Sequence, residues 1–121
     1  MLKMNRRGYL DINIKNLHKY RFLSGFFFKK DFHEDGSCVT FARIVISESA
    51  SPGSNFLELN AFDVIEIVIG NLNKSTGVFV KIDDISNRMI EGGIFEISDI
   101  ESNQFRIICG FFDFKESVMA Q

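Results

Sequence analysis

The residue types best suited to acid–base chemistry meet in one short segment, HEDGSC, at residues 33–38. His33 stands directly before Glu34 and Asp35, and a carboxylate beside an imidazole can orient it as a general base. Asp35 followed by Gly36 is also typical of a turn, in which a histidine is simply solvated. We therefore predict an exposed turn histidine and keep a base function for His33 as the alternative.

The two cysteines, Cys38 and Cys109, lie far apart and form no disulfide framework, so we expect reduced, buried thiols. Cys109 falls in an apolar segment, where burial raises the pKa of a thiol and makes the thiolate scarce. A metal site needs more closely spaced ligands than His33, Glu34, Asp35 and Cys38 provide. The sequence also lacks phosphate-loop, dinucleotide-binding, nucleophile-elbow and HExxH motifs. We predict no metal, no cofactor and no enzymatic activity.

Four carboxylates stand in two connections on either side of one predicted strand: Asp83, Asp84, Asp99 and Glu101. Whether they meet in space depends on the folding, which leaves them at opposite ends of that strand or brings them together. Clustered carboxylates attract a basic partner and accelerate encounter with it. These four residues are the predicted partner-binding site, and a solvated polar edge is the alternative explanation.

The charge is distributed unevenly although the net charge is only −2. Residues 1–30 carry eight basic side chains and one acidic one, whereas residues 31–121 carry 6 basic and 15 acidic ones. The basic segment suggests a second function, nucleic-acid binding or regulation, through phosphate contacts by Arg6, Arg7, Lys15, Lys19, Lys29 and Lys30. The 15 carboxylates elsewhere oppose it, unless strands of the two halves interleave and mix the charges on one surface.

The length of 121 residues predicts a single domain over residues 1–121, with a frayed tail at 115–121. Hydrophobic residues make up 45% of the chain and charged residues 25%, which are globular proportions. No segment reaches the roughly 20 apolar residues that span a bilayer, and the start of the chain does not resemble a signal peptide. We therefore expect a cytoplasmic protein without membrane association, and the oligomeric state stays open.

Alternating apolar residues predict three strands in the first half of the chain. Residues 9–15 place Leu10, Ile12 and Ile14 on one face. In residues 21–29, one face carries Phe22, Phe26 and Phe28, and the other carries Leu23 and Phe27. The second strand is therefore predicted to be buried on both sides. Residues 38–48 are rich in β-branched side chains and form the third predicted strand.

Residues 56–76 fit either a helix or a strand. Ala61, Ile65, Val68 and Leu72 recur at helical spacing, and Asn60 is a suitable N-cap residue. The many β-branched residues between Val64 and Ile69 favour a strand instead. We predict the helix, because capping signals are present at both ends.

The last third of the chain predicts a short strand at 78–82, a helical turn within 83–93, and a hairpin. The hairpin joins strands 94–98 and 104–114 through the polar connection 99–103. The predicted fold class is α+β, an antiparallel sheet of about six strands with one main helix packed on one face.

A small, mildly acidic domain of this kind, with acidic turns and no catalytic motif, resembles the immunity proteins of bacterial polymorphic toxins and contact-dependent growth inhibition systems. The resemblance implies a binding protein that neutralises a cognate toxin domain. It further implies that the toxin is a nuclease whose basic active-site groove the immunity protein occludes. The assignment of Asp83, Asp84, Asp99 and Glu101 to that contact comes from their charge and not from the resemblance.

Overall fold

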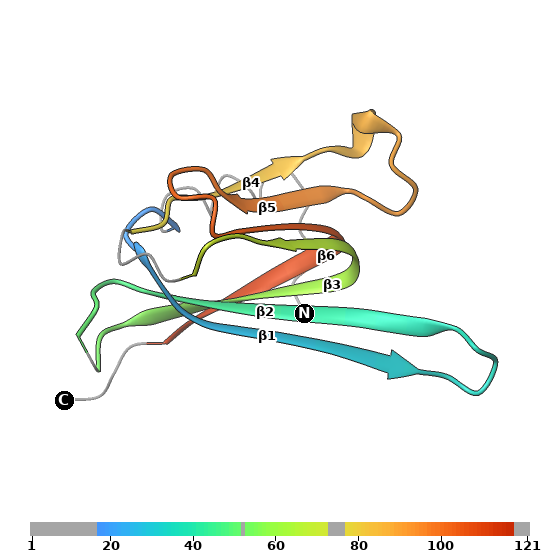
Figure 1. Cartoon of the computed structure of the whole chain (residues 1–121), viewed down its shortest axis with the longest axis horizontal. Helices are drawn as coiled ribbons and strands as arrows, with labels where there is room; N and C mark the ends of the chain where they lie inside the picture. Colours follow the sequence, from blue (N-terminus) through green and yellow to red (C-terminus); the bar gives the residue numbers. More distant parts are fainter. Residues whose placement is uncertain (1–16, 52, 73–76, 118–121) are drawn as a thin grey trace.

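The computed structural model describes residues 17–51, 53–72 and 77–117, and these form one antiparallel six-stranded sheet (Figure 1). The strand order is β1-β2-β3-β6-β5-β4. A short 3₁₀ segment, η1 (Ser86–Arg88), joins β4 to β5. The strands are β1 (Phe22–Phe32), β2 (Cys38–Ser47), β3 (Phe56–Ile69), β4 (Val80–Asp84), β5 (Phe95–Asp99) and β6 (Phe105–Ser117).

The main helix predicted at residues 56–76 is wrong, because residues 56–69 form the central strand β3. Leu57, Leu59 and Ala61 are buried in alternation along this strand, which is the period of a strand and not of a helix. Asn60 caps nothing; its side chain bridges the two neighbouring strands. The fold is therefore an antiparallel β-fold and not the predicted α+β arrangement.

The sheet folds over on itself where β3 and β6 run together. Their register shifts between Val64 and Glu66, and Asp63, just before the shift, has a φ of 54°. An irregularity of this kind bends a strand and increases its twist. As a result, β4 and β5 lie over β1 and β2 in a second layer, and β3 and β6 contribute to both layers (Figure 1).

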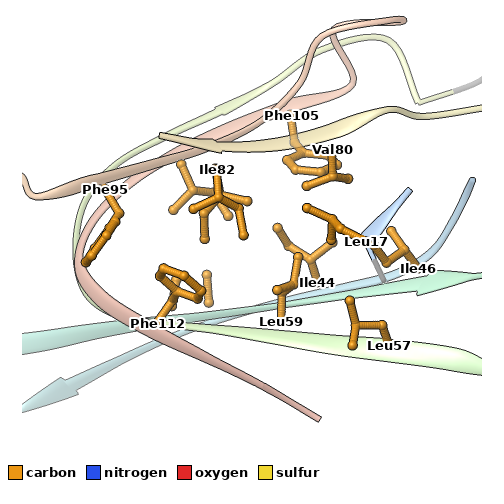
Figure 2. Packing of buried hydrophobic residues seen from close by; sticks show 14 of the residues in the cluster. Leu17, Ile44, Ile46, Leu57, Leu59, Val80, Ile82, Phe95, Phe105 and Phe112 are labelled. Carbon is orange, nitrogen blue, oxygen red and sulfur yellow. The ribbon is translucent and has the colours of Figure 1, made fainter. Parts of the chain in front are cut away.

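The core lies between these two layers (Figure 2). Ile44, Leu59 and Phe112 approach from the layer of β1 and β2, and Val80 and Ile82 approach from the layer of β4. An apolar sheet face must be covered by another element. The folded-over half of the same sheet covers it here, which removes the need for the predicted helix.

Several other predictions agree with the structure. The strand at 38–48 corresponds to β2, and the hairpin of the last third corresponds to β5 and β6. The predicted strand at 78–82 begins two residues later as β4, and the helical turn predicted within 83–93 is η1. The predicted strand at 9–15 lies outside the described residues.

Two predictions about the ends of the sheet need correction. β1 lies at one edge of the six described strands and is not buried on both faces, since Phe27 and Phe28 are 50% and 48% exposed. Lys115, Glu116 and Ser117 of the predicted frayed tail pair with β3, so the prediction does not hold for them, and residues 118–121 lie outside the described residues.

A pair of substitutions in β3 tests this placement of the core. Leu59→Ala removes a fully buried side chain and should lower the free energy of unfolding by about 2–5 kcal/mol. Val68→Ala, in the same strand but 43% exposed, should cost less than about 1 kcal/mol. Urea unfolding of both variants measures the difference, and equal losses would contradict the two-layer core.

Candidate functional site

The structure separates the four predicted partner-binding carboxylates into two places. Asp83 and Asp84 end β4, whereas Asp99 ends β5 and Glu101 lies in the turn that follows. Val80, the first residue of β4, pairs with Asp99 in this antiparallel hairpin. Asp99 and Glu101 therefore lie near the start of β4, and Asp83 and Asp84 lie at its end. The separation along the strand is about 13 Å, four residues of extended chain. The four residues therefore do not form one cluster.

Asp99 is a structural residue, only 1% exposed. Its Oδ1 accepts hydrogen bonds from the backbone N–H groups of Phe79, Glu101 and Ser102 at 3.0, 3.0 and 3.2 Å. Its Oδ2 accepts another from the N–H of Gln104 at 3.0 Å. These bonds hold the β5–β6 turn and tie it to the segment before β4, so the carboxylate faces inward.

The other three carboxylates are closer to solvent and already have local partners. Asp84 Oδ1 accepts hydrogen bonds from the backbone and the hydroxyl of Ser86. Asp83 lies 3.6 Å from the ammonium of Lys81. Glu101 accepts two hydrogen bonds from the Arg21 guanidinium, at 2.9 and 3.0 Å. Their charges contribute to the field of the surface but are partly compensated.

Charges on the outer side of the β4–β5 layer form a balanced network. Arg106 reaches Glu66 at 3.2 Å and Glu96 at 3.1 Å, and Arg88 approaches the other oxygen of Glu96 at 3.4 Å. Two arginines thus face two glutamates across three strands and η1. This face is polar but is not strongly acidic.

The outer side of the opposite layer carries four phenylalanines in a row, which we call the aromatic row: Phe27, Phe41, Phe62 and Phe111. They come from the adjacent strands β1, β2, β3 and β6, with successive ring centroids 6.2, 5.3 and 4.7 Å apart. Phe41 pairs with Phe62, and Phe62 pairs with Phe111, so all three point to the same side. Phe27 and Phe111, at the two ends, are 50% and 41% exposed.

A row of polar side chains runs beside the aromatic row on the same face. Arg43 Nε donates to Asn60 Oδ1 at 2.8 Å, and Asn60 Nδ2 donates to Asp113 Oδ1 at 2.9 Å. The guanidinium of Arg43 also lies 5.4 Å from the ring centre of Phe41. These contacts cross β2, β3 and β6 and hold the polar groups next to the rings.

Sequence reasoning missed the aromatic row. Its only sequence signal is that Phe41 and Phe62 each adjoin a small residue, Ala42 and Ala61, that belongs to the opposite face. Alternation shows that these neighbours point in opposite directions, but it does not show that rings of different strands meet.

An open groove of about 500 Å³ lies on the other side of β1 and β2. Phe26, Phe28 and Lys30 line one wall, and apolar residues of β3, including Val64 and Ile65, line the other. His33 does not line this groove and lies in the exposed β1–β2 turn, as the solvated-turn prediction expects.

The two cysteines differ in exposure. Cys109 is fully buried, and desolvation together with the nearby Asp63 carboxylate raises the pKa of its thiol to about 12. It is therefore a protonated core residue, as predicted. Cys38 is exposed and lines the groove, so the expectation that both thiols are buried is wrong for this one.

Most of the lysines and arginines that the structure describes among the first thirty residues form ion pairs with carboxylates. Lys19 lies 3.5 Å from both Glu48 and Glu116, and Lys29 lies 3.3 Å from Asp31. Arg21 is held by Glu101. These contacts show the mixing of charges that opposes a nucleic-acid interface, while Arg6, Arg7 and Lys15 lie outside the described residues.

Two kinds of feature are missing from residues 17–51, 53–72 and 77–117. No group of three or more histidines, cysteines or acidic residues is arranged to hold a metal ion there. No helix in that part of the chain is long and apolar enough to cross a membrane.

Comparison with known protein families gives a match over most of the chain. The model of a family described as "Immunity protein PIM8" matches residues 9–115. No curated protein and no solved structure matches the chain.

The structural assignment of Asp99 leads to a stability prediction. Asp99→Ala leaves several backbone N–H groups without their acceptor and should lower the free energy of unfolding by about 3 kcal/mol. Asp83→Ala removes only an exposed ion pair and should cost about 0–1 kcal/mol. Urea unfolding compares the two variants, and a stable Asp99→Ala protein would show that this carboxylate does not hold the turn.

Proposed function

This chain belongs to the PIM8 family of immunity proteins, and from that membership we propose that it neutralises a cognate bacterial toxin domain by binding it and covering its active site. Inhibition by occlusion requires a stable surface and no bond-making step. The two-layer sheet supports this function, since its core is enclosed and its outer faces are free to bind.

The observation that carries the finer proposal is the excess of negative charge over most of the chain. Residues 31–121 hold 15 acidic and 6 basic side chains. A nuclease binds the phosphate backbone of its substrate with basic residues, so its groove attracts an acidic protein. We therefore propose a nuclease as the cognate toxin.

The acidic turns fit a function in steering better than one in close contact. Electrostatic attraction at a distance sums over the whole surface and does not require the charges to cluster. Asp83, Asp84 and Glu101 can contribute in this way from both ends of β4. Asp99 contributes indirectly, because its hydrogen bonds hold the turn that carries Glu101.

We also propose the setting in which the protein acts, the bacterial cytoplasm within a contact-dependent growth inhibition or related polymorphic-toxin system. Two free cysteines, one of them exposed, are compatible with a reducing compartment.

Co-expression with a candidate toxin domain, chosen from the genes that neighbour this one, tests the function directly. We expect the two proteins to elute as one complex in size-exclusion chromatography, and the purified protein to abolish toxin nuclease activity at about equimolar ratio. A wild-type protein that neither binds this domain nor reduces its toxicity would refute the proposal.

The steering function of the acidic turns has its own test. The triple variant Asp83→Asn, Asp84→Asn and Glu101→Gln keeps the side-chain shapes and removes three charges. We expect its association rate with the toxin domain to fall about tenfold at low salt, with little change in the dissociation rate. Stopped-flow mixing at several salt concentrations measures both rates.

The matched control keeps the charge and changes the geometry. Asp83→Glu combined with Glu101→Asp should associate at the wild-type rate, because steering depends on charge rather than on close fit. An unchanged association rate in the triple variant would rule out a steering function for these residues.

A further inference from the structure

We propose that the aromatic row, Phe27, Phe41, Phe62 and Phe111, is the surface on which the toxin domain docks, through basic side chains of the toxin. This inference rests on the proposed function and deepens it, since it names the contact surface and the chemistry of the partner.

The first argument is that these rings do not belong to the core. On three of these four strands, β2, β3 and β6, the enclosed face is supplied by Ala42, Ile44, Leu59, Ala61 and Phe112. The outward positions next to the row are occupied by polar residues, among them Arg43, Asn60 and Asp113. A solvated sheet face is normally polar throughout. Four aligned phenylalanines on such a face therefore need an explanation other than core packing.

Sheet stabilisation explains why the rings pair but not why the ends of the row stay exposed. Paired aromatic residues on neighbouring strands contribute roughly 0.2–1 kcal/mol each, which accounts for the Phe41–Phe62 and Phe62–Phe111 pairs. Phe27 and Phe111 have a ring neighbour on one side only and remain about half exposed. An exposed apolar strip bordered by polar groups is typical of a protein-binding surface.

The size and composition of this face fit the centre of an interface. The row crosses three spacings between strands, about 14 Å. A standard interface takes roughly 800 Å² from each partner, with an apolar centre and a polar rim. Arg43, Asn60 and Asp113 provide such a rim along one side, already oriented by their mutual hydrogen bonds.

The charge around the row identifies the chemistry of the partner. The Arg43 guanidinium beside Phe41 is matched by the Glu58 carboxylate at 3.8 Å, and two further carboxylates remain. Asp63 follows Phe62 directly and lies against Gly110, next to Phe111, and Asp113 lies two residues beyond Phe111 on the same face. Neither carboxylate has a cationic partner among the described residues. Exposed ring faces and carboxylates that lack a cationic partner together favour arginine and lysine, through cation–π contacts and ion pairs. A basic groove rim on the toxin fits this combination.

Two neighbouring residues of β1 provide a matched test. Phe27 and Phe28 are equally exposed, but Phe27 belongs to the aromatic row and Phe28 lines the groove on the opposite side. With the toxin domain identified by the co-expression test as the probe, Phe27→Ser and Phe111→Ser should each raise the Kd at least tenfold. Phe28→Ser should change it less than about threefold. Asp63→Asn removes one charge, and asparagine readily adopts the positive φ of this position. This variant should raise the Kd about threefold to tenfold.

The outcomes separate this inference from the proposed function. If wild-type protein does not bind the toxin domain, the function itself fails. If wild-type protein binds, but Phe28→Ser weakens binding as much as Phe27→Ser does, the docking surface is wrong and the function stands.

A second measurement on the wild-type protein avoids any effect of substitution on folding. Hydroxyl-radical footprinting reports the accessibility of phenylalanine rings in the free protein and in the complex. We expect Phe27 and Phe111 to become protected in the complex and Phe28 to stay accessible. Protection of Phe28 alone would overturn the proposal.

Discussion

The bend shared by β3 and β6 is the constraint on which the structure depends. Between Val64 and Glu66 the two strands change register, and the sheet turns back over itself. Without that bend, one face of a single sheet would remain open to water. With it, Ile44 and Leu59 in one layer meet Val80 and Ile82 in the other, and the two layers enclose a core that needs no covering helix from the described residues. The same bend brings the Asp63 carboxylate close to the Cys109 thiol, whose pKa it helps to raise.

Folding the sheet in this way leaves two outer faces of different chemistry. One carries the alternating network of Glu66, Arg106, Glu96 and Arg88, which balances its own charge. The other carries the aromatic row and its polar neighbours. For an immunity protein this suggests a division between long-range attraction, to which all the surface carboxylates contribute, and close contact, which depends on a compact apolar centre.

Local patterns were sufficient for some elements and misleading for others. β2 and the β5–β6 hairpin have strong alternation and clear turns, and both were predicted. Residues 56–69 fit both the spacing of a helix and the alternation of a strand. Asn60 resembles a helix cap in the sequence, but in the structure its side chain binds partners on β2 and β6. Asp99 was selected as a surface acid because its neighbours are polar. Its burial depends on Phe79 and Gln104 presenting backbone N–H groups to it, which no local pattern reveals.

The sequence by itself determined which neighbours lie on opposite faces, such as Phe41 and Ala42, and it determined the excess of acidic charge. Only the tertiary structure decided which of the two faces became the core and which strands lie side by side. Alternation along a strand has a period of two residues, so it relates each residue to the next but not to the other strands. The bend and the strand order supplied that missing relation, and with it the row of four rings.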